Sequence, residues 1–108
     1  MKIPKSLKIG GRSYKVLYPH IFTDSCQNLY GQHDSSGQTI KMADKDTFGV
    51  VRHPESIAHT FMHEILHAVD NVYVGGKIQS LDCCEHIIDQ LAEGLCQVLK
   101  DNKLDFSK

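Results

Sequence analysis

Two histidines and a glutamate form an HExxH pattern in the second half of the chain: His63, Glu64 and His67. Histidines four residues apart lie one turn above each other on a helix, so both rings can bind one metal ion. Neutral imidazole nitrogens suit Zn²⁺ and occupy adjacent corners of its tetrahedron. Glu64 follows the first histidine, which directs its carboxylate toward the open corner of the metal. The pattern predicts Glu64 as the base that deprotonates a zinc-bound water, whose pKa the metal lowers to about 7.

A catalytic zinc site needs a third protein ligand, and the next predicted helix offers acidic side chains at helical spacing. We expect Glu85 to complete a His₂Glu site and Asp89 to accept the free ring N–H of a ligating histidine, which fixes its tautomer. Glu93 is expected to be solvated. Cys83 and Cys84 stay open as substitute ligands, because thiolates also bind zinc. The alternative for the carboxylates is a charged helix edge that faces water.

The other histidines fit this ion less well. His59 precedes His63 by one turn but lies about 12 Å along the axis from His67, so the three cannot share one ion. We expect His59 to lie on the helix surface or to support a ligand. His86 points about 100° away from Glu85 on an ideal helix and is expected to be exposed. No spacing recruits the remaining histidines: His20, His33 and His53.

Two long helices must position these residues. Pro54 suits the first position of a helix, and the apolar period predicts that the helix continues to Tyr73. Gly75-Gly76 ends it. The second helix begins after a cap at Ser80 or Asp82 and runs to about residue 102. The apolar stripes are Ile57, Phe61, Ile65, Ala68 and Val72 on the first helix, and Cys84, Ile87, Ile88, Leu91, Leu95, Val98 and Leu99 on the second.

The first half of the chain predicts strands. Residues 5–18 alternate apolar and polar side chains around Gly10-Gly11, which is typical of a β-hairpin. Residues 29–33 and 38–43 predict two further strands around a turn at 34–37. The strand at 38–43 is expected to edge a cleft, where an extended peptide could pair with it. We expect a short helix at 20–29, a loop at 44–53 and a frayed tail at 103–108.

Composition limits the class of protein. A chain of 108 residues with 41% apolar residues predicts a single domain spanning residues 1–108. The net charge of −1 does not suggest nucleic acid or an anionic membrane as a partner. No apolar run is long enough for a membrane span or a signal peptide, so we expect a cytoplasmic protein. Its four cysteines are then expected to be reduced thiols: Cys26, Cys83, Cys84 and Cys96.

The motif and the residues after it resemble the zincin metallopeptidases of the gluzincin kind, closest to short phage or prophage ImmA/IrrE-type peptidases. In that group a glutamate ligand follows HExxH on the next helix, with Asp or Asn four residues later; here EHIIDQLA stands at 85–92. The opening IGGRSYKV at 9–16 is also similar. Tyr73 and His86 are the only candidates for the residue that stabilises the transition state, and neither stands at the position where the family has this residue.

Together these observations predict an α+β domain: a small, mostly antiparallel sheet packed on two long helices, with one Zn²⁺ held by His63, His67 and Glu85. The expected function is hydrolysis of a peptide or protein substrate with Glu64 as general base. One alternative is a non-catalytic zinc-stabilised interaction module, whose site would be closed by a fourth protein ligand such as Cys83. Another is an interaction domain without a metal.

Overall fold

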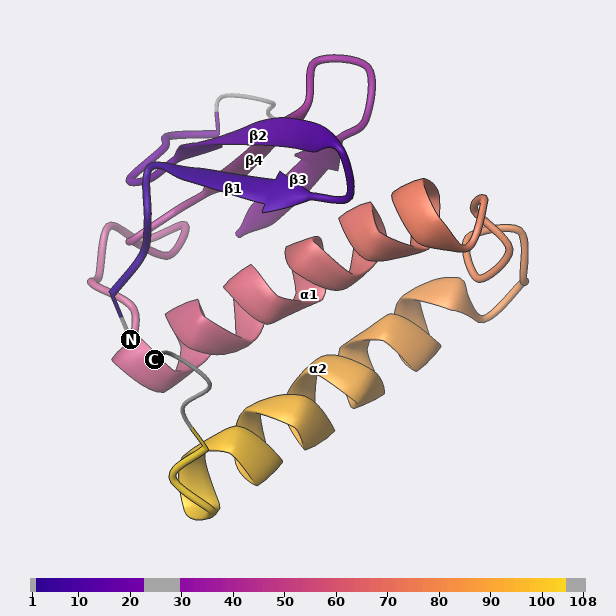
Figure 1. Ribbon diagram of the computed structural model, residues 1–108. Helices are drawn as coiled ribbons and strands as arrows, with labels where there is room; N and C mark the ends of the chain where they lie inside the picture. Colours follow the sequence, from indigo (N-terminus) through magenta and orange to yellow (C-terminus); the bar gives the residue numbers. More distant parts are fainter. Residues whose placement is uncertain (1, 23–29, 105–108) are drawn as a thin grey trace.

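The computed structural model describes residues 2–22 and 30–104 and shows the predicted α+β fold (Figure 1). A four-stranded sheet packs on one side of the first helix, and the second helix packs on its other side. Among the described residues, no helix is long and apolar enough to cross a membrane. The elements in chain order are β1 (Ser6–Ile9), β2 (Arg12–Leu17), β3 (Gly31–Asp34), β4 (Thr39–Met42), α1 (Pro54–Tyr73) and α2 (Cys84–Asp101).

Both predicted hairpins are confirmed. β1 and β2 pair antiparallel around Gly10, whose positive φ of 62° suits glycine. β3 and β4 also pair antiparallel, and the Asp34 carboxylate accepts the backbone N–H groups of Ser36 and Gly37 in the turn between them. The short helix predicted at 20–29 lies mostly outside the described residues, and 20–22 have no regular structure.

The sheet has the strand order β1-β2-β4-β3, with β2 and β4 parallel. This pairing places Val16 opposite Ile40, and both side chains are buried. The expectation that the strand at 38–43 edges a cleft is therefore wrong, because β4 is paired on both sides. β3 is the edge strand that lies beside α1.

The hydrophobic core lies between the sheet and α1. Apolar side chains that alternate along β2 and β4 meet one face of the helix. The predicted stripe of α1 is confirmed, because Ile57, Phe61 and Ala68 are buried and Ile65 and Val72 pack against them. The remaining buried core residues come from the strands: Ile9, Tyr14, Val16, Ile40 and Met42.

The second helix begins at Cys84 with Cys83 as its N-cap, later than the predicted cap at Ser80 or Asp82. The turns before this helix are held by α1. The buried carboxylate of Asp70 accepts the N–H groups of Ile78 and Gln79, which ties the connecting turns to the end of α1.

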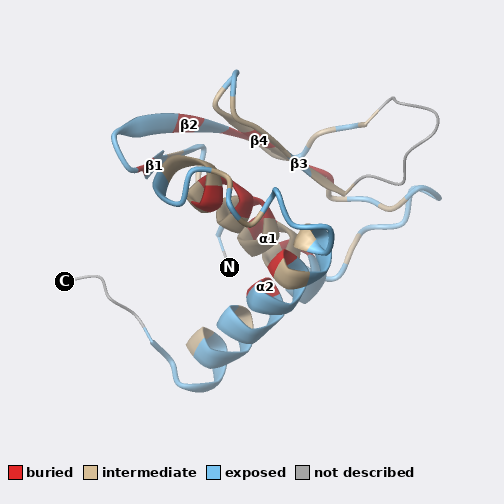
Figure 2. Ribbon diagram, turned by 90° about the vertical axis from the view of Figure 1, so that its right-hand side faces the viewer, coloured by how far each residue is buried: buried red, intermediate tan, exposed pale blue. Residues whose placement is uncertain are grey.

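The apolar stripe of α2 is only partly covered. Ile88 and Ala92 are buried against α1, whereas Leu91, Leu95 and Val98 are 40–44% exposed. Figure 2 shows α2 exposed along most of its length, while α1 is buried along its centre. Among the described elements α2 contacts α1 and not the sheet, so its position depends on one helix–helix interface.

Candidate metal centre

Both histidines of the HExxH pattern come from the middle of α1, where His67 is buried and His63 is half-buried. Nε2 of His63 lies 3.2 Å from Nε2 of His67, and the two rings meet edge to face with centroids 4.9 Å apart. One helical turn separates the residues, so this convergence follows directly from the four-residue spacing.

Glu85 reaches the same point from the first turn of α2. Its Oε2 lies 3.0 Å from His63 Nε2, and its Oε1 lies 3.0 Å from His67 Nε2. Metal–ligand bonds of about 2.0–2.1 Å in a tetrahedron separate ligand atoms by about 3.3 Å. The three groups therefore lie at the spacing of a metal's coordination shell, and their mixed nitrogen and oxygen donors fit Zn²⁺.

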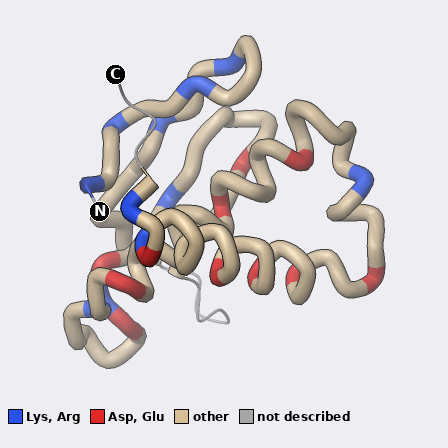
Figure 3. The backbone as a smooth tube through the Cα atoms, turned by 60° about the horizontal axis from the view of Figure 1, so that its bottom comes forward, with Lys and Arg blue, Asp and Glu red and all other residues tan. Residues whose placement is uncertain are grey.

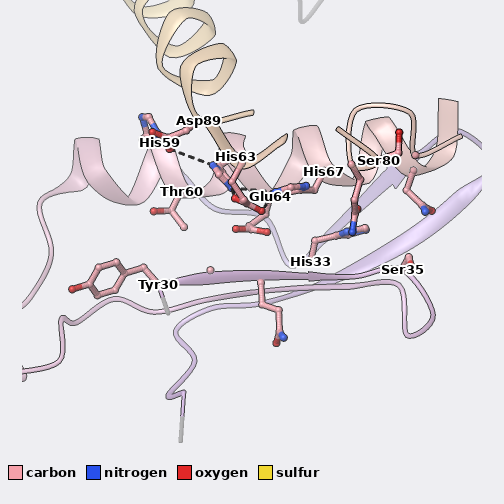
Figure 4. Close-up of a pocket in the computed structure, with 16 residues that line it drawn as sticks. Tyr30, His33, Ser35, His59, Thr60, His63, Glu64, His67, Ser80 and Asp89 are labelled. Atoms are coloured by element: carbon pink, nitrogen blue, oxygen red, sulfur yellow. Dashed lines mark hydrogen bonds and ion pairs between the residues drawn. The ribbon is translucent and has the colours of Figure 1, made fainter. Parts of the chain in front are cut away.

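Asp89 and His59 lie behind the first of these ligands (Figure 4). Asp89 Oδ1 lies 3.4 Å from His63 Nδ1 and 2.9 Å from His59 Nε2. The hydrogen bond with His59, followed by the charges of the two histidines, lowers the pKa of the Asp89 carboxyl. His59 is too far along the helix from His67 to share one ion with it. It contacts instead the Asp89 carboxylate that faces His63.

Glu64 is buried beside the two histidines, with 7% of its surface exposed. Burial, helped by the negative charge of Glu85, raises the pKa of its carboxyl to about 7. The opposite wall is β3 at Gly31, where an added Cβ would lie 2.9 Å from Glu64 Oε2 and 2.6 Å from Thr60 Cγ2. The close approach of β3 to α1 therefore depends on glycine, a requirement that the HExxH spacing does not reveal.

These residues line one cleft of about 780 Å³ between β3 and α1, closed at one end by the connection to α2. In Figure 4 the side chains of His63, Glu64 and His67 point from α1 toward this cleft, and β3 runs along its opposite side. Asn71, Gln79 and Ser80 line the end near the connection, whose backbone Asp70 holds. The sequence does not single out Asp70, although it stands three residues after His67.

His33 on β3 also lines the cleft, although no sequence spacing recruits it. Its Nε2 lies 3.0 Å from the hydroxyl of the buried Tyr14, and its ring is parallel to that of His67 within 3°, with centroids 6.5 Å apart. Burial and the neighbouring His67 lower the pKa of the His33 imidazole. Only the packing of β3 on α1 brings these two histidines together.

The other candidate residues lie elsewhere. Among the described residues, Cys83, Cys84 and Glu93 belong to no group that converges with the histidine pair. Tyr73 and His86 are exposed and do not line the cleft.

Glu85 and Asp89 of α2 line the cleft, whereas lysine and arginine gather on the first hairpin (Figure 3). A cation is therefore favoured at the centre by Glu64, Glu85 and Asp89 together. Comparison of the chain with models of protein families, with curated proteins and with solved structures found no match.

Proposed function

We propose that this protein is a zinc-dependent metallopeptidase that hydrolyses peptide bonds in a peptide or protein substrate. One observation carries the proposal: His63, His67 and Glu85 converge at coordination distances beside a buried glutamate in an open cleft. The proposal includes the cytoplasmic setting that the sequence suggests.

The donor set assigns a role to each residue. His63, His67 and Glu85 would hold Zn²⁺, which when bound lowers the pKa of water and polarises a carbonyl group. Asp89 faces Nδ1 of His63, a position from which it orients that ring and keeps Nε2 free to bind. His59 anchors Asp89 from the preceding turn of α1.

Glu64 is the general base in this proposal. Its carboxyl lines the cleft beside both histidines, where it can accept a proton from water. A carboxyl held in this position can take up a proton from water and return it to the leaving amine.

The cleft suits an extended peptide. Among the described residues β3 pairs with β4 alone, so we assign its other edge, with its backbone N–H and C=O groups, to pairing with a substrate strand. Gly31 allows this edge to lie against Glu64, which places a paired backbone near the base. Substrate pairing is therefore assigned to β3 and not to β4.

A non-catalytic zinc module is the alternative from another class. Such a site is closed by a fourth protein ligand. Among the described residues the histidine pair gains Glu85 but no cysteine, and the remaining side opens into the cleft beside Glu64. These features favour the enzyme over the module.

The test compares wild-type protein with Glu64→Gln, using Glu93→Gln on the exposed side of α2 as the matched control. Zinc content is measured by atomic emission, and hydrolysis is followed on a mixed peptide library by mass spectrometry. We expect about one zinc per chain in all three proteins and a rate that falls about 10²–10⁴-fold only in Glu64→Gln, because a positioned base contributes that factor. Zinc binding without hydrolysis by the wild type would favour the module, and absence of zinc after reconstitution would refute both.

A further inference from the structure

His33 faces the catalytic side of the sheet because of its register in the β3–β4 ladder. It stands opposite Ile40, and residues that stand opposite each other project to the same face. Ile40 is buried in the core against α1, so His33 projects toward α1 as well. At that position along the helix it meets His67, and both rings line the same cleft (Figure 4).

Tyr14 determines which nitrogen of His33 carries the proton. The Tyr14 side chain is fully buried, and the only hydrogen-bond partner of its hydroxyl among the described residues is His33 Nε2. A buried hydroxyl that does not donate is costly, so the Tyr14 O–H donates to Nε2. Nε2 is then unprotonated, and the ring proton of the neutral imidazole resides on Nδ1.

The remaining nitrogen is therefore a donor held in a fixed position. Nδ1 is the ring nitrogen that does not contact Tyr14, and no described residue accepts a hydrogen bond from it. The stacked contact with the Tyr14 ring, with centroids 5.5 Å apart, keeps the imidazole from turning. A pre-oriented N–H beside a metal centre is the kind of group that stabilises an oxygen as it gains negative charge.

We infer that His33 is the transition-state donor of the proposed peptidase: its Nδ1–H donates a hydrogen bond to the oxygen of the scissile carbonyl, and Tyr14 is the positioning residue behind it. The catalytic role of His33 rests on the proposed function. The tautomer and the donor itself are properties of the chain that hold with or without catalysis.

The first measurement is the tautomer, read by long-range ¹H–¹⁵N NMR of the histidine rings in the zinc-loaded protein near neutral pH. We expect His33 to carry its proton on Nδ1, and Tyr14→Phe to shift it toward Nε2, because the hydroxyl donor is lost. A wild-type ring protonated on Nε2 alone would overturn the inference, whatever the protein does to peptides.

The second measurement compares three substitutions in the zinc-loaded protein. His33→Ala removes the donor, whereas His33→Asn keeps an amide nitrogen as many bonds from Cβ as Nδ1. His86→Ala is the matched control, an exposed histidine outside the cleft. We expect kcat to fall about 10²-fold in His33→Ala with KM nearly unchanged, and His33→Asn to recover most of the loss. Full activity in His33→Ala, or no recovery in His33→Asn, would contradict the role.

A third arm separates this inference from the proposed function. If the wild type binds zinc but cleaves no peptide, binding of N-phosphoryl-leucine amide by calorimetry replaces the kinetics. Its phosphoryl oxygens bind zinc and present negative charge to a nearby donor. We expect about tenfold weaker binding in His33→Ala than in wild type or His86→Ala, the effect of one charge-assisted hydrogen bond. Equal binding in all three proteins would overturn the inference.

Discussion

The two helices contribute to the candidate centre in different ways. α1 is covered by the sheet on one side and by α2 on the other, and it carries His63, Glu64 and His67 in half-buried or buried positions. Among the described elements α2 contacts α1 alone, and the side chains of Glu85 and Asp89 are 70% and 57% exposed. The histidine pair and Glu64 are therefore fixed by the core, whereas Glu85, the proposed third ligand, is held by one interface.

This difference indicates how the centre is assembled. A side chain in the packed region cannot move without disturbing the core, so the geometry of α1 is formed before any metal binds. α2 keeps its place through Ile88 and Ala92 and through the contacts of its acidic residues with the histidines. A metal ion that both helices bind would add a cross-link between a rigid element and a less constrained one.

The largest expected effect follows from removing Glu85, the metal ligand that we propose on α2. We expect Glu85→Ala to lower zinc affinity by more than 100-fold. Loss of a residue that only hydrogen-bonds to a metal ligand costs about 10–100-fold, and loss of a ligand itself should cost more. Competition with a chelator of known affinity measures it, and Glu93→Ala is the control on the same helix. Unchanged affinity in Glu85→Ala would move the third ligand to Cys83 or Cys84.

Glu64 should make the metal-free protein sensitive to pH, because α1 buries it. Its pKa in the folded protein, about 7, lies above the ordinary 4.5, so folding favours the protonated form. This contribution is complete below about pH 4.5 and is lost as the pH rises through about 7. Glu64→Gln should therefore gain up to about 3 kcal/mol over wild type between pH 5 and pH 8. Urea unfolding in EDTA tests this, and a constant difference would contradict it.

Substitution of Asp89 tests whether a residue of the exposed helix α2 supports His63 on the buried helix α1. Asp89→Ala leaves His63 Nδ1 without its acidic neighbour, so we expect zinc affinity to fall about 10–100-fold while the fold is kept. Asp82→Ala, an exposed carboxylate before α2, is the matched control. An effect equal to that of Glu85→Ala would mean that Asp89 binds the metal itself.

The smallest effect is expected on the apolar flank of α2. Leu91 is 44% exposed, so Leu91→Ala removes little buried surface, and we expect a loss of less than about 1 kcal/mol in the free energy of unfolding. Chemical unfolding at two protein concentrations measures it. A loss above about 2 kcal/mol that grows with concentration would show that this flank is covered in an oligomer.

Much of the framework could be predicted from the sequence because it is local. The apolar period and the Pro54 and Gly75 signals predict α1 with the bounds observed, and alternating side chains predict both hairpins. The predicted cap of α2 at Ser80 or Asp82 was wrong, because the observed N-cap is Cys83. The local pattern also does not reveal that Asp70 holds the turns before α2, a side-chain contact across nine residues. The prediction that β4 edges a cleft was wrong, because its parallel pairing with β2 leaves no signal in the local sequence.

The candidate site divides in the same way. The four-residue spacing alone determines that His63 and His67 face one point, because an α-helix repeats every 3.6 residues. The tertiary structure decided that Glu85 meets them, that Glu64 is buried against Gly31, and that β3 brings in His33. These contacts join residues 18 to 34 positions apart, and strand pairing and helix packing, not spacing along the chain, determine which of them form.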